Sequence, residues 1–299
     1  MTHILARAII FTAFFISVFG ELQAQEKDVK DKIEQIIDRS NGNIGVGVFD
    51  FASGLTVLIN NAHQFPMQSV FKFPLGMAVL DMVDRGKLKL DQQVYVSKND
   101  LQPTYSPLRD KFPDGNVNVT LADLLTYSVS LSDNNACDIL FRLVGGTQVV
   151  NDYIRGLGIK DMAIVATEMQ MSKGWDVQFE NYSTPEAMLD LLKVFQSGKK
   201  LSASSSGFLW KIMTESPTGL KRIKGKLPST AKVTHKTGTS GKNHKGITAA
   251  TNDVGIMTLP NGNQIAIVVF VSNSEANETA REMVIADIAK VTWDEFSAK

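Results

Sequence analysis

Cysteine is almost absent from this sequence, because Cys137 is the single thiol among 299 residues. One cysteine can form neither an internal disulfide nor a thiolate metal cluster. It lies in the apolar run 136–144, where a small buried side chain is favoured over a reactive thiol. The four histidines form no pair at ligand spacing, which argues against a metallo-hydrolase. We therefore expect no metal and no other cofactor.

The chain also lacks an excess of charge of either sign. It has 31 basic and 31 acidic residues, and no basic run is long enough to bind nucleic acid. Its composition, 43% hydrophobic and 21% charged, is ordinary for a globular protein. The length suits one large or two modest domains. We expect a monomer whose partner is a small molecule, and no nucleic-acid partner.

Hydrophobic runs of membrane-spanning length are missing as well. The apolar run 8–19 is too short to cross a bilayer comfortably. It follows Arg7 and precedes the small residue Ala24, which is the pattern of a secretory signal peptide. We therefore expect residues 1–24 to be removed, leaving a soluble periplasmic protein without stable membrane insertion. Because no cysteine follows the run, a bacterial lipid anchor is excluded.

The spacing of apolar residues predicts helices and strands in three blocks. An N-terminal block has a helix and a hairpin, at 27–39, 44–51 and 55–59. A long middle block reads as helices, at 71–83, 121–125, 136–144, 147–157, 187–195 and 206–214. A C-terminal block has three strands and a helix, at 232–238, 249–259, 264–271 and 275–296. Gly45 and Gly47 suggest that the first strand is closely covered by other structure.

Neither end has enough strands for a sheet of its own. We therefore predict an α/β fold of the three-layer α+β kind, in which both ends of the chain build one antiparallel sheet flanked by terminal helices. Residues 25–66 and 218–299 would form this discontinuous lobe, and residues 67–217 would form an inserted all-helical lobe. Clefts between lobes are favoured sites for small ligands.

The stretch Gln68-Ser69-Val70-Phe71-Lys72 places a hydroxyl and an amine three residues apart at the start of an apolar run. On a helix, residues at this spacing share a face, so Ser69 and Lys72 can touch. A serine becomes a good nucleophile when a neighbouring base takes its proton. The alternative is a helix-capping serine followed by a solvated lysine.

Two further polar clusters follow in the sequence. Ser132-Asp133-Asn134 interrupts an apolar region, and Lys236-Thr237-Gly238 ends a predicted strand. Taken singly, the first could be a turn or a helix cap, and the second a surface lysine. Together with Ser-x-x-Lys and in this order, they match the signature of class A β-lactamases and penicillin-binding proteins.

The resemblance extends over essentially the whole mature chain. The stretches from Ser69 to Lys72, 127–138, 235–241 and 249–255 resemble the PER and CblA/CepA branch of class A serine β-lactamases. The resemblance implies a fold of the β-lactamase/transpeptidase kind. It also implies hydrolysis of β-lactams, with the cephalosporinase or extended-spectrum activity of several members of that branch.

The resemblance also assigns the reacting groups. Ser69 would attack the lactam carbonyl and become acylated, and Lys72 would help to remove its proton. The backbone N–H groups of Ser69 and Thr239 would form the oxyanion hole. Ser132 would relay a proton to the departing lactam nitrogen. Glu168 would position the water that hydrolyses the acyl-enzyme, whether or not it also acts in acylation.

The substrate-binding residues implied by the resemblance are Asn134, Lys236, Thr237, Gly238, Thr239, Tyr105, Arg222 and Ser172. Asn134 would hold the amide of the substrate side chain, and Lys236 and Thr237 would bind its carboxylate. Arg222 either binds the same carboxylate or belongs to a solvated basic face. Tyr105 either forms the aromatic wall at the mouth of the cleft or simply packs.

The expected omega-type loop, residues 163–182, departs from the common family pattern. In Glu168-Met-Gln-Met-Ser172, a serine replaces the asparagine that usually helps to position the water. Ala166 and Asn181 occupy the positions of the usual arginine–aspartate bridge. These differences indicate an altered loop. Glu180 is the other acidic candidate in the segment, and the alignment favours Glu168.

Two other functions would use the same clusters. A D-alanyl-D-alanine carboxypeptidase or transpeptidase would share the acyl-enzyme, but would need no Glu168 and commonly carries accessory domains, none of which is expected after Lys299. A penicillin-binding sensor would be acylated without turnover, and such sensors are normally attached to membrane helices.

Overall fold

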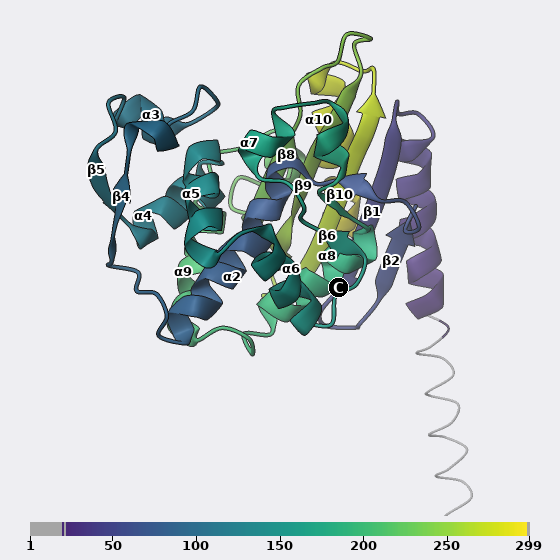
Figure 1. Ribbon diagram of the computed structural model, residues 1–299. Coiled ribbons are helices and arrows are strands. Elements are labelled where there is room, and N and C mark those ends of the chain that lie inside the picture. The colour runs from purple at the N-terminus through teal and green to yellow at the C-terminus, as the bar shows by residue number, and fades with distance from the viewer. Residues whose placement is uncertain (1–19, 21, 298–299) are drawn as a thin grey trace, which may run out of the picture.

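The computed structural model describes residue 20 and residues 22–297. Its centre is a five-stranded antiparallel sheet in the order β2-β1-β10-β9-β8 (Figure 1). The strands are β1 (Asn43–Asp50), β2 (Thr56–Ile59), β8 (Lys232–Thr239), β9 (Thr248–Thr258) and β10 (Gln264–Ser274). The prediction that both ends of the chain share one antiparallel sheet is confirmed.

Strands β9 and β10 are the middle of this sheet, and nearly all of their residues are buried. Apolar residues on both faces make them suitable for a position between two layers of helices. The predicted hairpin joins them, with the Leu259 amide donating to the Asn263 carbonyl at 2.8 Å and Gly262 at φ +89°. A residue without a Cβ adopts this left-handed conformation at little cost.

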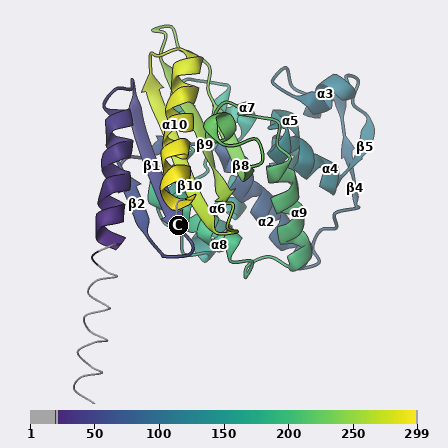
Figure 2. The same ribbon diagram turned by 180° about the vertical axis from the view of Figure 1, so that it is seen from behind.

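The outer face of the sheet is covered by two helices from opposite ends of the chain (Figure 2). They are the N-terminal helix, residues 22–37, and α10 (Glu278–Ser297). Their apolar residues join those of the sheet in one buried cluster that includes Val29, Ile33, Val46, Val269, Ile285 and Trp293. Burial of each such side chain contributes roughly 1.5–3 kcal/mol before entropy is counted.

The inner face packs against the helical middle of the chain. Helix α8 (Pro185–Gln196) crosses β1 so closely that a Cβ on Gly47 would lie 2.8 Å from the Leu189 side chain. A Cβ on Gly45 would lie 2.3 Å from the ring of Phe65. Both glycines therefore serve close packing, as the sequence predicts.

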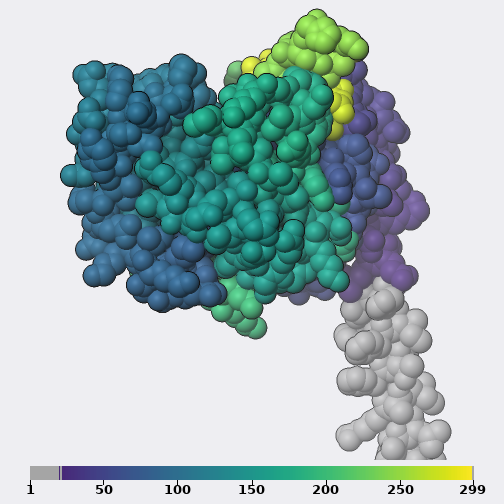
Figure 3. Space-filling view, viewed as in Figure 1, coloured from purple at the N-terminus to yellow at the C-terminus, as the bar shows by residue number. Residues whose placement is uncertain are grey.

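The rest of the middle block is mainly helical and forms the left side of Figure 1 and much of the surface in Figure 3. Its helices are α2 (Lys72–Asp84), α3 (Pro107–Lys111), α4 (Leu121–Leu125), α5 (Asn134–Val144), α6 (Thr147–Gly156), α7 (Glu168–Met171) and α9 (Ala203–Thr214). Two small sheets accompany them, β4 (Gln93–Val96) with β5 (Val117–Thr120), and β3 (Phe65–Pro66) with β7 (Tyr182–Ser183) and β6 (Met162–Ala163). The prediction that residues 67–217 are all helical is therefore wrong, because β4 to β7 lie within this range. Helix α2 lies buried among these elements.

The N-terminal helix begins earlier than the predicted residue 27 and runs through Ala24, where cleavage is expected. Most of the predicted signal, residues 1–19 and 21, lies outside the described residues. Within the part of the chain that the structure describes, no helix is both long enough and apolar enough to cross a membrane.

Candidate active site

Ser69 lies on a short 3-10 turn, η1 (Gln68–Phe71), which leads directly into α2. Gln68 before it has φ +48°, a left-handed conformation that is strained for a residue with a side chain. Lys72 is the first residue of α2, and its Nζ lies 3.0 Å from Ser69 Oγ. The contact that the spacing predicts is present, and the alternative of a solvated lysine is wrong, because Lys72 is fully buried.

Lys72 lies among polar atoms from three other segments. Its Nζ is 2.8 Å from the Ser132 carbonyl, 2.6 Å from Asn134 Oδ1 and 2.9 Å from Glu168 Oε1. The three ammonium hydrogens are donated to Ser69 Oγ, the Ser132 carbonyl and Asn134 Oδ1, and Glu168 Oε1 adds an ion pair without a hydrogen bond. Lys72 therefore lies between a serine hydroxyl and a carboxylate, each within reach of its amine.

Ser132 lies in the turn between a single π-helical turn, η3 (Thr126–Ser130), and α5. Its φ is +62°, and such strain in a residue with a side chain is typical of functional sites. Asp133 holds the turn, because its carboxylate accepts from the Ala136 and Leu108 amides at 2.8 and 2.6 Å. The turn thus directs Ser132 Oγ towards β8.

Lys236, on edge strand β8, completes this contact. Its Nζ donates to Ser132 Oγ at 2.9 Å and to the Thr237 carbonyl at 2.9 Å. The side chain is fully buried, so the alternative of a surface lysine at a strand end is wrong. Burial is the main cause that holds the pKa of Lys236 well below its usual value, and the nearby Lys72 charge lowers that pKa further.

Strand β8 passes directly beside the turn that carries Ser69. A Cβ on Gly238 would lie 2.3 Å from the Met67 carbonyl oxygen, so only glycine permits this approach. Thr239 follows at the end of the strand, and its hydroxyl accepts a hydrogen bond from Arg222 at 2.7 Å. The two expected oxyanion-hole residues, Ser69 and Thr239, thus come from neighbouring elements.

The loop that carries Glu168 is closed by Asn181. Its Oδ1 accepts from the Val165 and Ala166 amides at 2.7 and 2.8 Å, and its Nδ2 donates to the Ala166 carbonyl at 2.7 Å. The side chain is fully buried. A single asparagine therefore closes the loop base, at one of the positions where the sequence lacks the usual ion pair.

Asp138, on α5, fixes the first turn of α7. Its carboxylate accepts from the Glu168 and Met169 amides at 2.8 and 2.9 Å, which satisfies two free N–H groups at a helix start. Burial raises the pKa of Asp138 to about 6, although the two N–H donors lower it. The sequence analysis missed this residue, because its spacing from Glu168 carries no signal of contact.

A cleft of about 410 Å³ opens beside these groups. Its walls include Gln68, Asn134, Glu168, Ser172, Trp175 and Thr239. Ser172 Oγ donates to the Met169 carbonyl at 2.7 Å. The Tyr105 side chain is 60% exposed, and its backbone carbonyl accepts from the Asn134 amide at 3.1 Å.

Arg222 is 4% exposed, so the alternative that it belongs to a solvated basic face is wrong. Its guanidinium donates to the carbonyls of Gly238 and Asn252 at 3.2 and 3.0 Å. It also pairs with Glu282 on α10 at 3.2 Å. Arg222 therefore lies beneath the edge of the sheet, and its hydrogen bond to the Thr239 hydroxyl connects it to the cleft.

The remaining substrate-binding candidates hold fixed positions. Thr237 Oγ1 forms a hydrogen bond of 2.8 Å with Thr218 Oγ1, and Asn134 Nδ2 donates to Thr104 Oγ1 at 2.8 Å.

Among residues 20 and 22–297, no three His, Cys, Asp or Glu side chains gather closely enough to hold a metal ion. The pair formed by His235 and Asp253, at 2.8 Å under β8, is a second contact that the sequence analysis missed.

Comparison with known proteins places the chain in a family. The family model described as the Beta-lactamase enzyme family matches residues 28–296. Beta-lactamase VEB-1 of Pseudomonas aeruginosa is 44% identical, over 97% of this chain and 97% of that protein. The extended-spectrum beta-lactamase PER-1 of the same organism is 43% identical, over 91% of this chain and 89% of that protein.

Solved structures agree. The crystal structure of TLA-1 extended-spectrum beta-lactamase superposes with a TM-score of 0.89 at 46% identity, covering 91% of this chain and 99% of that one. A beta-lactamase from Chitinophaga pinensis gives 0.88 at 51% identity, covering 89% and 98%.

Proposed function

Because the chain belongs to the class A serine β-lactamases, in the branch that includes VEB-1 and PER-1, we propose that it opens β-lactam rings through an acyl-enzyme at Ser69. It is a hydrolase, and its activity confers resistance to β-lactam antibiotics. The observation that carries this proposal is that Ser69, Glu168 and Ser132 meet around the buried Lys72 ammonium at the cleft.

In acylation, the four polar neighbours of Lys72 support a proton relay. When the Lys72 ammonium gives one proton to Glu168, 2.9 Å away, its nitrogen gains a lone pair. That lone pair can then accept the proton of Ser69 Oγ, 3.0 Å away, as the oxygen attacks the lactam carbonyl. The Ser132 carbonyl and Asn134 Oδ1 keep the amine in place throughout.

The oxyanion and the leaving nitrogen need separate partners. The amides of Ser69 and Thr239 would stabilise the carbonyl oxygen as it becomes negative. Ser132 Oγ, supported by Lys236 at 2.9 Å, would pass a proton to the lactam nitrogen and take one from the Lys72 ammonium. Lys72 would then recover the proton held by Glu168, which becomes a carboxylate again before deacylation. The Lys236 ammonium, with the Thr237 hydroxyl, would also bind the substrate carboxylate, while Asn134 would hold the side-chain amide.

Deacylation requires a water molecule and a base. Glu168 is nearly buried and fixed from behind by Asp138, so its carboxylate can orient water towards the ester on Ser69. Ser172 lines the same cleft, and we infer that it takes over part of the usual asparagine's role. Arg222 and Tyr105 would complete the binding of substrate at the two ends of the cleft.

The test is a stopped-flow assay of the purified mature protein with a chromogenic cephalosporin. The unmutated protein should show sustained turnover, whereas Glu168→Gln should give a burst of one equivalent followed by almost none. Glu180→Gln is the matched control, because Glu180 is an exposed carboxylate in the same loop. A single-turnover burst in the unmutated protein would instead indicate a sensor or a slow peptidase.

We further infer that the substrates include cephalosporins and extended-spectrum compounds, because the relatives include proteins named extended-spectrum beta-lactamases. Steady-state kcat/KM values for a penicillin, a cephalosporin and an oxyimino cephalosporin would test this. Rates for the oxyimino compound near the detection limit would contradict it.

We also propose export to the periplasm as a soluble monomer after cleavage near Ala24. The pattern of residues 1–24 supports export, and N-terminal sequencing of the mature protein should begin at Gln25. Light scattering should give the mass of one chain. The division into a lobe of residues 25–66 with 218–299 and a lobe of residues 67–217 stays a prediction, which limited proteolysis can test.

A further inference from the structure

A buried pair of titratable side chains, His235 and Asp253, lies on the outer face of the sheet, away from the cleft. In the β8–β9 ladder, His235 lies opposite Gly255 and Asp253 lies opposite Thr237. Side chains alternate along a strand, so the pair shares its face with Val233, which belongs to the cluster under α10. A Cβ on Gly255 would lie 2.7 Å from the Cβ of His235, so the glycine leaves room for the ring.

Hydrogen bonding fixes the form of this pair. His235 Nδ1 lies 2.8 and 3.0 Å from the two Asp253 oxygens, and both side chains are fully buried. Within the described part of the chain, His235 Nε2 has no hydrogen-bond partner, and a buried N–H without an acceptor is costly. The ring therefore carries a hydrogen on Nδ1 and donates it to the Asp253 carboxyl group.

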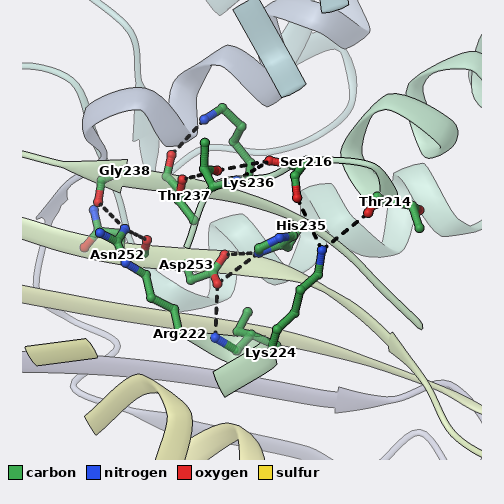
Figure 4. Close-up of polar contacts among 12 residues, drawn as sticks. Thr214, Ser216, Arg222, Lys224, His235, Lys236, Thr237, Gly238, Asn252 and Asp253 are labelled. Atoms are coloured by element: carbon green, nitrogen blue, oxygen red, sulfur yellow. Dashed lines mark hydrogen bonds and ion pairs between the residues drawn. The ribbon is translucent and has the colours of Figure 1, made fainter. Parts of the chain in front are cut away.

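Asp253 also holds the main chain next to Arg222. Its Oδ2 accepts from the Ile223 amide at 3.2 Å, at the start of η5 (Ile223–Lys226). From this anchored position, the guanidinium donates to the Gly238 carbonyl and the Thr239 hydroxyl. Figure 4 shows Asp253 between His235 and the Arg222–Lys224 segment, directly below the end of β8.

Three cations lie near the pair, the buried Arg222 and Lys236 and the half-buried Lys224. Lys224 donates to the carbonyls of Thr214 and Ser216 at 3.3 and 3.4 Å. Burial lowers the pKa of Lys224, and Asp253 opposes that shift. Burial also lowers the pKa of Lys236, whose side chain lies on the other face of β8, and the charge of Asp253 raises it. One carboxylate thus favours the charged form of two ammonium groups.

We propose that Asp253, oriented by His235, is a positioning residue for the end of the cleft that binds the substrate carboxylate. It holds the Ile223 amide, so that Arg222 reaches Thr239, and it supplies negative charge behind Lys236. This inference rests on the proposed function, because it assumes that Lys236 and Arg222 bind the carboxylate of a β-lactam.

The groups that face Lys236 come from four elements. Lys72 from α2 and Arg222 near η5 disfavour its charged form, whereas Glu168 from α7 and Asp253 from β9 favour it. Removal of Asp253 therefore lowers the pKa of Lys236. Because carboxylate binding needs the ammonium, the alkaline limb of kcat/KM moves to lower pH.

The experiment compares Asp253→Asn with the unmutated enzyme, by steady-state kinetics across pH with a chromogenic cephalosporin. The amide keeps the shape and removes the charge. KM should rise at least fivefold at pH 7, kcat should change by less than about threefold, and the alkaline limb should shift down by about one pH unit. Asp287→Asn is the control, because it removes a partly exposed carboxylate of α10 that pairs with Lys226.

A purely structural role for the pair would lower the melting temperature and leave KM and the alkaline limb in place, which would overturn the proposal. If Asp253→Asn does not fold, His235→Phe removes the Nδ1–H donor and retains the carboxylate. KM should then rise at least threefold, and an unchanged KM would overturn the proposal equally. Failure of the proposed function would look different, because the unmutated enzyme itself would not turn over.

Discussion

Replacement of Asp138 by asparagine tests how the enzyme holds Glu168, the carboxylate that we propose for deacylation. Burial raises the pKa of Asp138 from 3.8 to about 6. At pH 7 the ionised Asp138 carboxylate therefore destabilises the folded protein by at most about 3 kcal/mol, because a difference of one pKa unit corresponds to about 1.4 kcal/mol. The folded state holds an extra proton between pH 4 and 6, so the stability of the native enzyme falls as pH rises through that range.

Asp138→Asn removes this ionisation cost. It also loses one acceptor, because the Glu168 and Met169 amides donate to different oxygens of Asp138 and the NH2 group that replaces one of them cannot accept. An unsatisfied buried donor costs roughly 1–3 kcal/mol, so the two effects nearly cancel at pH 7. Without its second anchor, α7 holds Glu168 less firmly, and deacylation should slow at least tenfold, while acylation changes less.

Two measurements check this reasoning. Urea unfolding at several pH values should show that the stability of the Asp138→Asn variant no longer falls as the pH rises from 4 to 6. Stopped-flow kinetics should show acyl-enzyme accumulating in the variant. If the variant keeps both the native pH dependence of stability and the native deacylation rate, Asp138 does not have the role described.

Three other substitutions give sharp expectations. Asn181→Ala leaves the Val165 and Ala166 amides unsatisfied, so urea unfolding should show a loss of roughly 2–4 kcal/mol, and Asn99→Ala, at an exposed site, should lose far less. Gly238→Ala forces β8 away from the Met67 carbonyl, so kcat/KM should fall at least a hundredfold; near-normal activity would show that the strand can shift without harm.

The sequence was enough to predict the architecture and to single out residues that the structure brings together at the cleft. Apolar runs and turn residues in 232–271 specify strands, and their arrangement in one sheet with the N-terminal hairpin follows from the small number of strands at each end. Ser69 and Lys72 meet because helical spacing brings them together. Ser132 and Lys236 were identified because three motifs occur in the order that is typical of class A β-lactamases.

The supporting contacts could not be predicted in this way. Asp138 touches Glu168, 30 residues further along the chain, and neither periodicity nor composition indicates such a pairing. Arg222 lies in a run that reads as basic and exposed, yet Glu282 from the last helix makes its burial possible. His235 and Asp253 meet only because the register of β8 and β9 brings them together.

The most direct test of the central claim is the mass of the acyl-enzyme. Glu168→Gln should be mixed with a cephalosporin, quenched in acid and examined by intact mass spectrometry and peptide mapping. The account predicts one adduct per chain, on the peptide that contains Ser69, and no adduct in the double variant that also carries Ser69→Ala. An adduct on another peptide, or none at all, would contradict it.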